Sequence, residues 1–423
     1  MSKAALASAY LRTRWLGATM RDRIALERRQ RRGIERLRAH AVANTAFYRA
    51  LGATPFESWP VVDKATVMAR FEAFNVLGLS AADLWPMVER GEAPVGHDVG
   101  CSTGTSGNRG LYLVSDAERF TWLGTIIAKA VPDVWRRRHR VAVVLPRSSR
   151  LYASANESRV LTLLFLDIGQ GLSAIADRLT AFRPTIVVAP PKVLRTLADQ
   201  TVKIAPERLF SAAEVLDPPD RERIEAAYRV RLGQIYMATE GLFGVSCAHG
   251  TLHLAEDAVH VELEPVGDGL VTPIVTDFTR RTQVLARYRM NDLLRLHEHP
   301  CACGSPLRAV AEIIGRRDDV FDLPAAGRVG SRVLVTPDVL RNAILDADRS
   351  IDDFRLRQIS AGTLELVLPP SLPTCIHEAA RRSLSNACIR AGAAADIILT
   401  LETLSGSGTA KLRRVERRWK GPA

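Results

Sequence analysis

The sequence predicts an α/β protein with a large N-terminal domain and a small, mobile α+β C-terminal domain. Its 423 residues are too many for one ordinary core, which favours two domains. Over residues 141–228, short apolar runs alternate with segments of helical periodicity, a pattern typical of a buried sheet covered by helices. A βαβ-like pattern follows the charged turn at residues 315–319. We therefore place the N-terminal domain at residues 1–314, a hinge at 315–320 and the C-terminal domain at 321–423.

The first elements are expected to be helices. Residues 1–50 predict a helical, arginine-rich arm. Asp63 is the predicted N-cap of a helix that runs through Phe74. Ser115, with Glu118 three residues later, predicts a capping box at the start of the next helix.

The central region then alternates, and a strand-rich region follows it. Strands are expected at residues 141–145, 185–189, 234–237, 259–264, 270–277 and 284–289, and helices with proline near the first turn at 191–200 and 219–228. In the C-terminal domain, strands at 364–368 and 397–401 are expected to flank a helix over 373–391.

The charge and composition exclude several classes of protein. The net charge is +12, but the arginine-rich segment at residues 21–38 has the apolar stripe of an amphipathic helix, and no nucleic-acid-binding motif accompanies it. Nucleic acid is therefore not favoured as a partner. No apolar stretch is long enough to span a membrane, and no export signal is recognised, so we expect a cytoplasmic protein without a membrane partner. Six scattered cysteines are too few for a disulfide scaffold, so reduced thiols are expected.

Five short motifs contain residues that suit nucleotide chemistry. They are the glycine-rich loop at 101–110, Tyr-Met-Ala-Thr-Glu at 236–240, Tyr-Arg-Met-Asn-Asp at 288–292, Gly-Arg-Arg-Asp-Asp at 315–319 and a Gly-x-x-Lys loop ending at Lys411. Glycines let a loop turn its amides and hydroxyls toward phosphate oxygens, and Arg109 could neutralise phosphate charge. Glu240 could hold Mg²⁺, and Asp292 could accept both hydroxyls of a ribose. Each motif alone also fits an ordinary turn, strand end or basic tail.

In this order, the motifs resemble those of the adenylate-forming superfamily, which includes acyl- and aryl-CoA synthetases, adenylation domains and luciferases. The chain resembles in particular the phenylacetate-CoA ligase branch and its deazaflavin-adenylating relatives. The segments Leu252-His253-x-x-Glu256-Asp257 and Cys301-x-Cys303-Gly304 are also similar to that branch. The resemblance covers residues 64–418 and implies a large adenylate-forming domain followed by a small lid domain.

The resemblance also implies roles for individual residues. The ATP-binding set would be Ser102, Thr103, Gly104, Thr105, Ser106, Gly107, Arg109, Tyr236, Thr239, Asp292 and Arg316. Lys411, Glu240 and Thr239 would be catalytic, with Mg²⁺ on Glu240, and Asp318 would be the hinge. The chain departs from the superfamily because its loop ends Gly107-Asn108-Arg109-Gly110, without the usual lysine; Arg109 could take over that contact.

The implied activity is that of an ATP-dependent, AMP-forming ligase, an enzyme of biosynthesis. It would activate a small carboxylic acid, expected to be aromatic, and pass it to coenzyme A. Transfer to an acyl-carrier protein or an amine, and activation of nitrite, are alternatives. A nucleotide-binding relic without activity is the alternative of another class.

Cysteines and histidines gather in the strand-rich region and raise the question of a metal. Cys247, His253, Cys301 and Cys303 could ligate a structural Zn²⁺, with His249 as a substitute for His253. The alternative is two reduced cysteines in a loop with surface histidines nearby.

Overall fold

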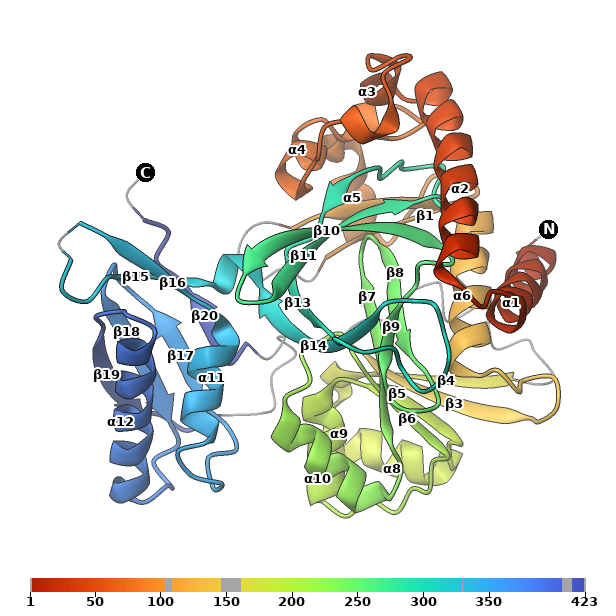
Figure 1. Ribbon diagram of the computed structural model, residues 1–423. Coiled ribbons are helices and arrows are strands. Elements are labelled where there is room, and N and C mark those ends of the chain that lie inside the picture. Colours follow the sequence, from red (N-terminus) through yellow and green to blue (C-terminus); the bar gives the residue numbers. More distant parts are fainter. Residues whose placement is uncertain (1, 103–108, 146–160, 329, 405–412, 422–423) are drawn as a thin grey trace. The chain divides into compact units, whose positions relative to one another are not determined.

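The computed structural model describes residues 2–102, 109–145, 161–328, 330–404 and 413–421 (Figure 1). The chain forms two compact units: Met1–Met290 with Arg295–Glu312, and Asn291–Leu294 with Ile313–Ala423. In the described ranges, no helix combines the length and apolar character needed to cross a membrane. The division after Glu312 lies close to the boundary expected after residue 314. That residues 291–294 also belong to the second unit was not expected. The hinge at 315–320 stays a prediction.

The first unit contains most of the helices. They are α1 (Ser2–Thr19), α2 (Arg23–Asn44), α3 (Ala46–Arg49), α4 (Lys64–Ala69), α5 (Ala81–Arg90), α6 (Asp116–Ala130), α8 (Leu172–Phe182), α9 (Pro191–Asp199) and α10 (Pro218–Tyr228), with short 3-10 turns at Phe56–Ser58, Phe71–Phe74 and Ile168–Gln170. The predicted helical arm over residues 1–50 is found as α1, α2 and α3. Asp22 caps α2 by accepting a hydrogen bond from the Ala25 amide at 2.7 Å.

The strands between residues 97 and 316 belong to one large mixed sheet and a separate two-stranded ribbon. The ribbon is β1 (His97–Cys101) with β2 (Leu111–Ser115). The large sheet contains β3 (His139–Leu145), β4 (Leu161–Asp167), β5 (Ile186–Ala189), β6 (Arg208–Ala212), β7 (Leu232–Ala238), β8 (Gly241–Ser246), β9 (Leu252–Leu254), β10 (Val259–Gly267), β11 (Leu270–Asp277), β12 (Tyr288–Arg289), β13 (Asp292–Leu296) and β14 (Ala309–Arg316). Its order is β10-β11-β13-β14-β9-β8-β7-β6-β5-β3-β4, with β12 beside β11.

The part of the sheet from β4 to β7 is parallel and is covered by helices on both faces. Alternate residues of β3 show the two faces: Val141 and Val143 belong to a core with α1 and α6, whereas Ala142 and Val144 belong to a core with α8, α9 and α10. In Figure 1 these last three helices lie together against β5 and β6. The α/β prediction for this region is confirmed.

Two predicted elements were too long. The helix that Asp63 caps ends at Ala69, because Arg70 leaves the helical region with φ of −139°, and a 3-10 turn follows over Phe71–Phe74. The strand expected at 284–289 is reduced to Tyr288–Arg289, because Arg287 has φ of +50°, which an extended strand does not allow.

The second unit is a small α+β domain, as predicted. Its further elements are β15 (Phe321–Pro324), β16 (Arg332–Val335), α11 (Pro337–Leu345), β17 (Arg355–Gln358), β18 (Thr363–Leu368), α12 (Thr374–Arg390), β19 (Asp396–Leu401) and β20 (Val415–Arg417). β18 and β19 are parallel neighbours joined through α12, which confirms the βαβ-like pattern. Their apolar side chains pack with α11 and α12 into a core of their own.

Candidate active site and cysteine–histidine cluster

A pocket lies at the carboxyl end of β7, the last parallel strand of the sheet. The carboxyl ends of parallel strands are where α/β sheets commonly bind ligands. Its lining includes the polar or charged side chains of Lys64, Tyr112, Thr239, Glu240, Arg280 and Tyr288. Two of the residues assigned to ATP chemistry, Thr239 and Glu240, therefore share one pocket with four residues that the sequence analysis did not assign.

Glu240 is held in the pocket by three hydrogen bonds. The Tyr288 hydroxyl donates to its Oε1 at 2.8 Å, and the Thr239 hydroxyl donates to its Oε2 at 3.1 Å. The Arg280 guanidinium donates to its backbone carbonyl at 2.7 Å. Gly241 follows with φ of +155°, a conformation that side chains rarely adopt, so the chain can turn sharply from Glu240 into β8.

Arg280 is the buried centre of the pocket's charge network. Its guanidinium also donates to Gln283 Oε1 at 2.7 Å. Burial lowers the pKa of Arg280, while the charges of Asp277, Glu118 and Glu240 act in the opposite direction. Burial, then the charge of Glu240, raises the pKa of Tyr288 far above its ordinary value, so its hydroxyl stays a donor.

The capping box of α6 holds the segment that carries Arg280. Ser115 and Glu118 form this box, as predicted. Glu118 also accepts hydrogen bonds from the Arg281 amide and from the amide and hydroxyl of Thr282, the latter two at 2.8 and 2.6 Å. Burial alone would raise the pKa of Glu118, but these bonds lower it overall, so its carboxylate stays charged. A residue expected only to cap a helix therefore also positions the pocket.

Lys64 enters the pocket from the first residue of α4 and reaches the stem of the glycine-rich loop. Its Nζ donates to Ser102 Oγ at 3.2 Å, and the same oxygen accepts the Gly110 amide at 2.8 Å. A Cβ on Gly110 would lie 2.6 Å from Lys64 Cε, so the lysine stem packs directly on the loop's last glycine. Thr103, Gly104, Thr105, Ser106 and Gly107 lie outside the described residues, and Arg109 is exposed.

Tyr236 lies on the strand that leads to Thr239 and Glu240. It is a buried residue of β7, and its ring packs against Phe243 with the centroids 5.7 Å apart. Its place in the ATP-binding set stays a prediction.

The remaining residues that were predicted to bind ATP or to act in catalysis belong to the second unit or lie outside the described residues. Asp292 begins β13, and Arg316 ends β14. Asn291 Nδ2 donates to Asp318 Oδ2 at 2.6 Å, and the Asp318 amide returns a bond of 3.3 Å to Asn291 Oδ1. Asn291 thus ties the Tyr-Arg-Met-Asn-Asp motif to the predicted hinge. Lys411 lies outside the described residues.

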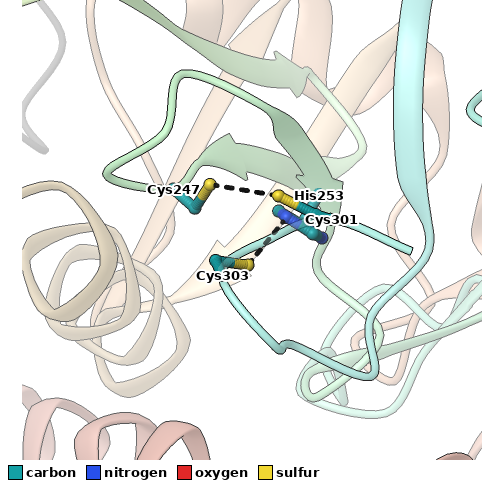
Figure 2. A group of neighbouring side chains, drawn as sticks. All are labelled: Cys247, His253, Cys301 and Cys303. Carbon is teal, nitrogen blue, oxygen red and sulfur yellow. Dashed lines mark hydrogen bonds between the residues drawn. The ribbon is translucent and has the colours of Figure 1, made fainter. Parts of the chain in front are cut away.

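The structure brings four of the candidate zinc ligands together and leaves the fifth out. Figure 2 shows the side chains of Cys247, His253, Cys301 and Cys303 pointing toward one another, with all four ligand atoms within 4.8 Å of one another. Cys247 Sγ lies 3.9 Å from Cys301 Sγ, and Cys303 Sγ lies 3.3 Å from His253 Nε2. His249, the substitute ligand, is not part of this cluster and lies in the turn before β9.

The residues that sequence reasoning missed carried weak signals. Lys64 directly follows the helix cap Asp63, and lysine is rare in this arginine-rich chain, which could have drawn attention to it. Tyr288 stands inside a recognised motif, but its role depends on Glu240, which is distant in sequence. Arg280 carries no local signal, because one arginine among many becomes distinctive only when it is buried.

Comparison with known proteins shows which proteins the chain is similar to. No family model matches the sequence. The chain is 25% identical over 202 residues to the phenylacetate-coenzyme A ligase of Thermus thermophilus, a match that covers 42% of this chain and 45% of that enzyme. The match thus spans less than half the length of this curated relative.

Solved structures match over a much larger part of the chain. A 2-hydroxyisobutyryl-CoA ligase in the postadenylation state, in complex with 2-HIB-AMP, is similar over 92% of this chain and 89% of its own, with a TM-score of 0.68 and 18% identity. An anthranilate CoA ligase in complex with anthranoyl-AMP is similar over 73% and 64%, with a TM-score of 0.50 and 14% identity. The chain has the fold of the adenylate-forming CoA ligases, and the predicted resemblance to their phenylacetate-CoA ligase branch is confirmed.

Proposed function

We propose that the protein is an AMP-forming ligase that activates a small, aromatic carboxylic acid with ATP and transfers the acyl group to coenzyme A. The observation that carries the proposal is the pocket at the carboxyl end of β7, where Thr239 and Glu240 meet Lys64 beside the stem of the glycine-rich loop. Hydroxyl, carboxylate and ammonium groups placed together in this way suit a magnesium-bound polyphosphate.

The reaction would proceed in two steps. A carboxylate oxygen of the acid attacks the α-phosphorus of ATP, the bond to the β-phosphate oxygen breaks, and pyrophosphate leaves. The sulfur of coenzyme A then attacks the acyl carbon, its proton is lost, and AMP leaves. Negative charge gathers on phosphate oxygens in the first step, so fixed cations and hydrogen-bond donors supply most of the catalysis.

Each residue of the pocket would serve that first step through its charge or its hydrogen bonds. Glu240 would hold Mg²⁺, which neutralises phosphate charge when bound. Both of its oxygens accept one hydrogen bond from a neutral hydroxyl and keep further lone pairs, so its carboxylate suits this hard cation. Thr239 would donate to the α-phosphate. Lys64 would supply a positive charge beside the glycine-rich loop, in addition to that of Arg109.

Residues of the second unit would complete the site. Asp292 would accept the ribose hydroxyls, with Arg316 nearby, and Lys411 would stabilise the attacking carboxylate and the α-phosphate. Movement about Asp318 would bring Lys411 in for adenylation and remove it for transfer. The bonds between Asn291 and Asp318 support this role, because they tie the ribose-binding motif to the hinge.

The aromatic acid and the acceptor are the finer parts of the proposal. Relatives named for phenylacetate and anthranilate support an aromatic acid, and every relative reported above is named as a CoA ligase. None of these steps requires zinc at Cys247, His253, Cys301 and Cys303, so a metal held there would be structural.

The test is pyrophosphate release from ATP and Mg²⁺ over a panel of aryl and acyl acids, followed by thioester formation with coenzyme A. We expect acid-dependent release that is greatest with an aryl acid and that falls about 100-fold or more in Lys411→Ala. Lys420→Ala, at a lysine outside the proposed site, is the matched control and should leave release unchanged.

Other outcomes would redirect the proposal. Acyl-AMP formation without a coenzyme A thioester would move the acceptor to a carrier protein or an amine. ATP binding without release for any acid would point to nitrite. A protein that does not bind ATP would contradict adenylation altogether.

A further inference from the structure

We propose that Cys247, His253, Cys301 and Cys303 hold a tetrahedral, structural Zn²⁺ that fastens the loop between β13 and β14 to the β8–β9 hairpin. The four donors come from two segments of the chain that are about 50 residues apart, the β8–β9 hairpin and the loop after β13. Cys247 lies in the turn after β8, His253 lies on β9, and the other two lie in the loop that follows β13 (Figure 2).

The spacing of the donor atoms matches a metal better than it matches any direct bond between them. Zinc–sulfur and zinc–nitrogen bonds of about 2.3 and 2.05 Å at tetrahedral angles place two sulfurs about 3.8 Å apart, and a sulfur and a nitrogen about 3.6 Å apart. The observed distances are 3.9 Å for the two sulfurs of Cys247 and Cys301, and 3.3 Å for Cys303 Sγ and His253 Nε2. A disulfide would need about 2.05 Å, so Cys247 and Cys301 are not joined by one.

His253 is oriented as a zinc ligand. Its Nδ1 lies 3.0 Å from the carbonyl oxygen of Leu307, which can only accept, so Nδ1 carries the proton and donates. Nε2 then has a free lone pair, and this is the nitrogen that faces Cys303. A histidine fixed through its other nitrogen in this way is the usual arrangement around protein-bound zinc.

The backbone shapes both cysteine segments around the same point. The Cys247 amide donates to the Thr251 carbonyl at 2.9 Å, which closes the hairpin turn. The Gly304 amide donates to the Cys301 carbonyl at 3.1 Å, and Gly304 has φ of +71°, which glycine adopts most easily. This tight turn brings Cys301 and Cys303 to one side of the loop, although a single residue separates them.

The donor set identifies the metal and its role. Three thiolates and one imidazole suit zinc, and four protein ligands close its coordination, so no position is left for a substrate. The loop at 297–308 contains no helix or strand in the described structure, so a metal would add to the hydrogen bonds that its last residues make with β9.

The first test is the metal content of the full chain, purified without a histidine tag and measured by mass spectrometry. We expect about one zinc atom per chain in the wild type, and less than a tenth of that in Cys301→Ser, because losing one of four ligands opens the site. Cys375→Ser, at an exposed cysteine of α12, and His249→Ala, at the histidine outside the cluster, should keep the full content. Equal zinc in Cys301→Ser and the wild type would overturn the proposal, and so would iron in place of zinc.

A second measurement does not depend on a folded variant. The wild type is stripped with a chelator and titrated with Co²⁺, whose visible spectrum reports its geometry and its thiolate ligands. We expect saturation at about one equivalent with tetrahedral bands and thiolate charge transfer, reversed by Zn²⁺. Octahedral bands, or no saturable binding, would contradict the site. Both readouts are independent of ligase activity, so they stand or fall separately from the proposed reaction.

Discussion

The two ends of strand β8 differ in how their polar groups are satisfied. Before its first residue, Glu240 receives hydrogen bonds from Tyr288 and Thr239, and Arg280 holds its carbonyl. After its last residue, Cys247 faces other sulfurs and an imidazole at distances that are longer than ordinary hydrogen bonds between nitrogen and oxygen. At the first end each carboxylate oxygen has a hydrogen-bond donor from the protein, whereas at the second end four metal-ligand atoms face one another.

The difference indicates what each end is built for. A carboxylate held by neutral hydroxyls keeps its charge and can bind and release a magnesium–nucleotide complex during turnover. Thiolates and an imidazole around one closed point would keep a metal permanently. The same strand would therefore connect an exchangeable ion at one end to a resident ion at the other, and the following predictions test that contrast.

The largest expected effect is at the exchangeable end. Glu240→Gln keeps the size of the side chain but removes the charge that would hold Mg²⁺. We expect acid-dependent pyrophosphate release to fall about 100- to 1000-fold, the loss that removal of one group stabilising the transition state commonly causes. Glu222→Gln, an exposed glutamate of α10, is the matched control and should keep full activity. A Glu240→Gln enzyme with normal rate and normal Mg²⁺ dependence would remove Glu240 from the site.

Lys64→Ala should have the next largest effect. A charged hydrogen bond to a phosphate is worth about 1.5–3 kcal/mol, so we expect kcat/KM for ATP to fall about 10- to 100-fold. Lys64→Arg should recover part of the loss, because it keeps the charge but not the shape that packs on Gly110. Lys203→Ala, at an exposed lysine, should change nothing. An unchanged kcat/KM in Lys64→Ala would show that Lys64 does not replace the lysine that is usual in the glycine-rich loop.

The contrast also shows which features a sequence can predict. Repeated local patterns predicted the parallel region, the capping box of Ser115 and Glu118, and the small domain, because periodicity and caps depend on neighbouring residues. Motif order pointed to Thr239 and Glu240, and donor chemistry pointed to the four residues of the cysteine–histidine cluster. The partners of Glu240 could not be predicted, because Arg280 and Tyr288 reach it only through the pairing of distant strands. The choice between His249 and His253 likewise needed the path of the hairpin.

At the resident end, Glu256 is a second anchor of the same loop. Glu256 stands three residues after His253, and its carboxylate is fully buried. It accepts hydrogen bonds from the Arg23 guanidinium at 2.6 and 2.7 Å and from the Arg308 guanidinium at 3.2 Å. Glu256→Gln removes the buried counter-charge of these two partly exposed arginines and leaves Arg23 with only the exposed Glu27, so we expect the free energy of unfolding in urea to fall by about 2 kcal/mol. Glu27→Gln removes the exposed partner of Arg23 and should cost less than about 0.5 kcal/mol. Equal losses in the two variants would mean that zinc alone secures the loop.

The smallest expected effect is that of Tyr288→Phe, which removes one hydrogen bond from Glu240. We expect a loss of about 1 kcal/mol in the free energy of unfolding, because Oε1 keeps its charge but loses its buried donor. Tyr228→Phe is the matched control: its buried hydroxyl has no hydrogen-bond partner among the described residues, so its removal should be neutral or slightly stabilising.

The pH dependence of unfolding is a second test of Tyr288. Burial raises the folded-state pKa of Tyr288 above its ordinary value of 10.0, so its contribution to stability is complete below pH 10.0 and declines as the pH rises above that value. Unfolding measured from pH 8 to 11 should therefore show a loss of stability above about pH 10 that is smaller in Tyr288→Phe than in the wild type. The same slope in both proteins would mean that Tyr288 is not buried against Glu240. Glu240 would then lack one of the hydrogen-bond donors that distinguish its end of β8 from the Cys247 end.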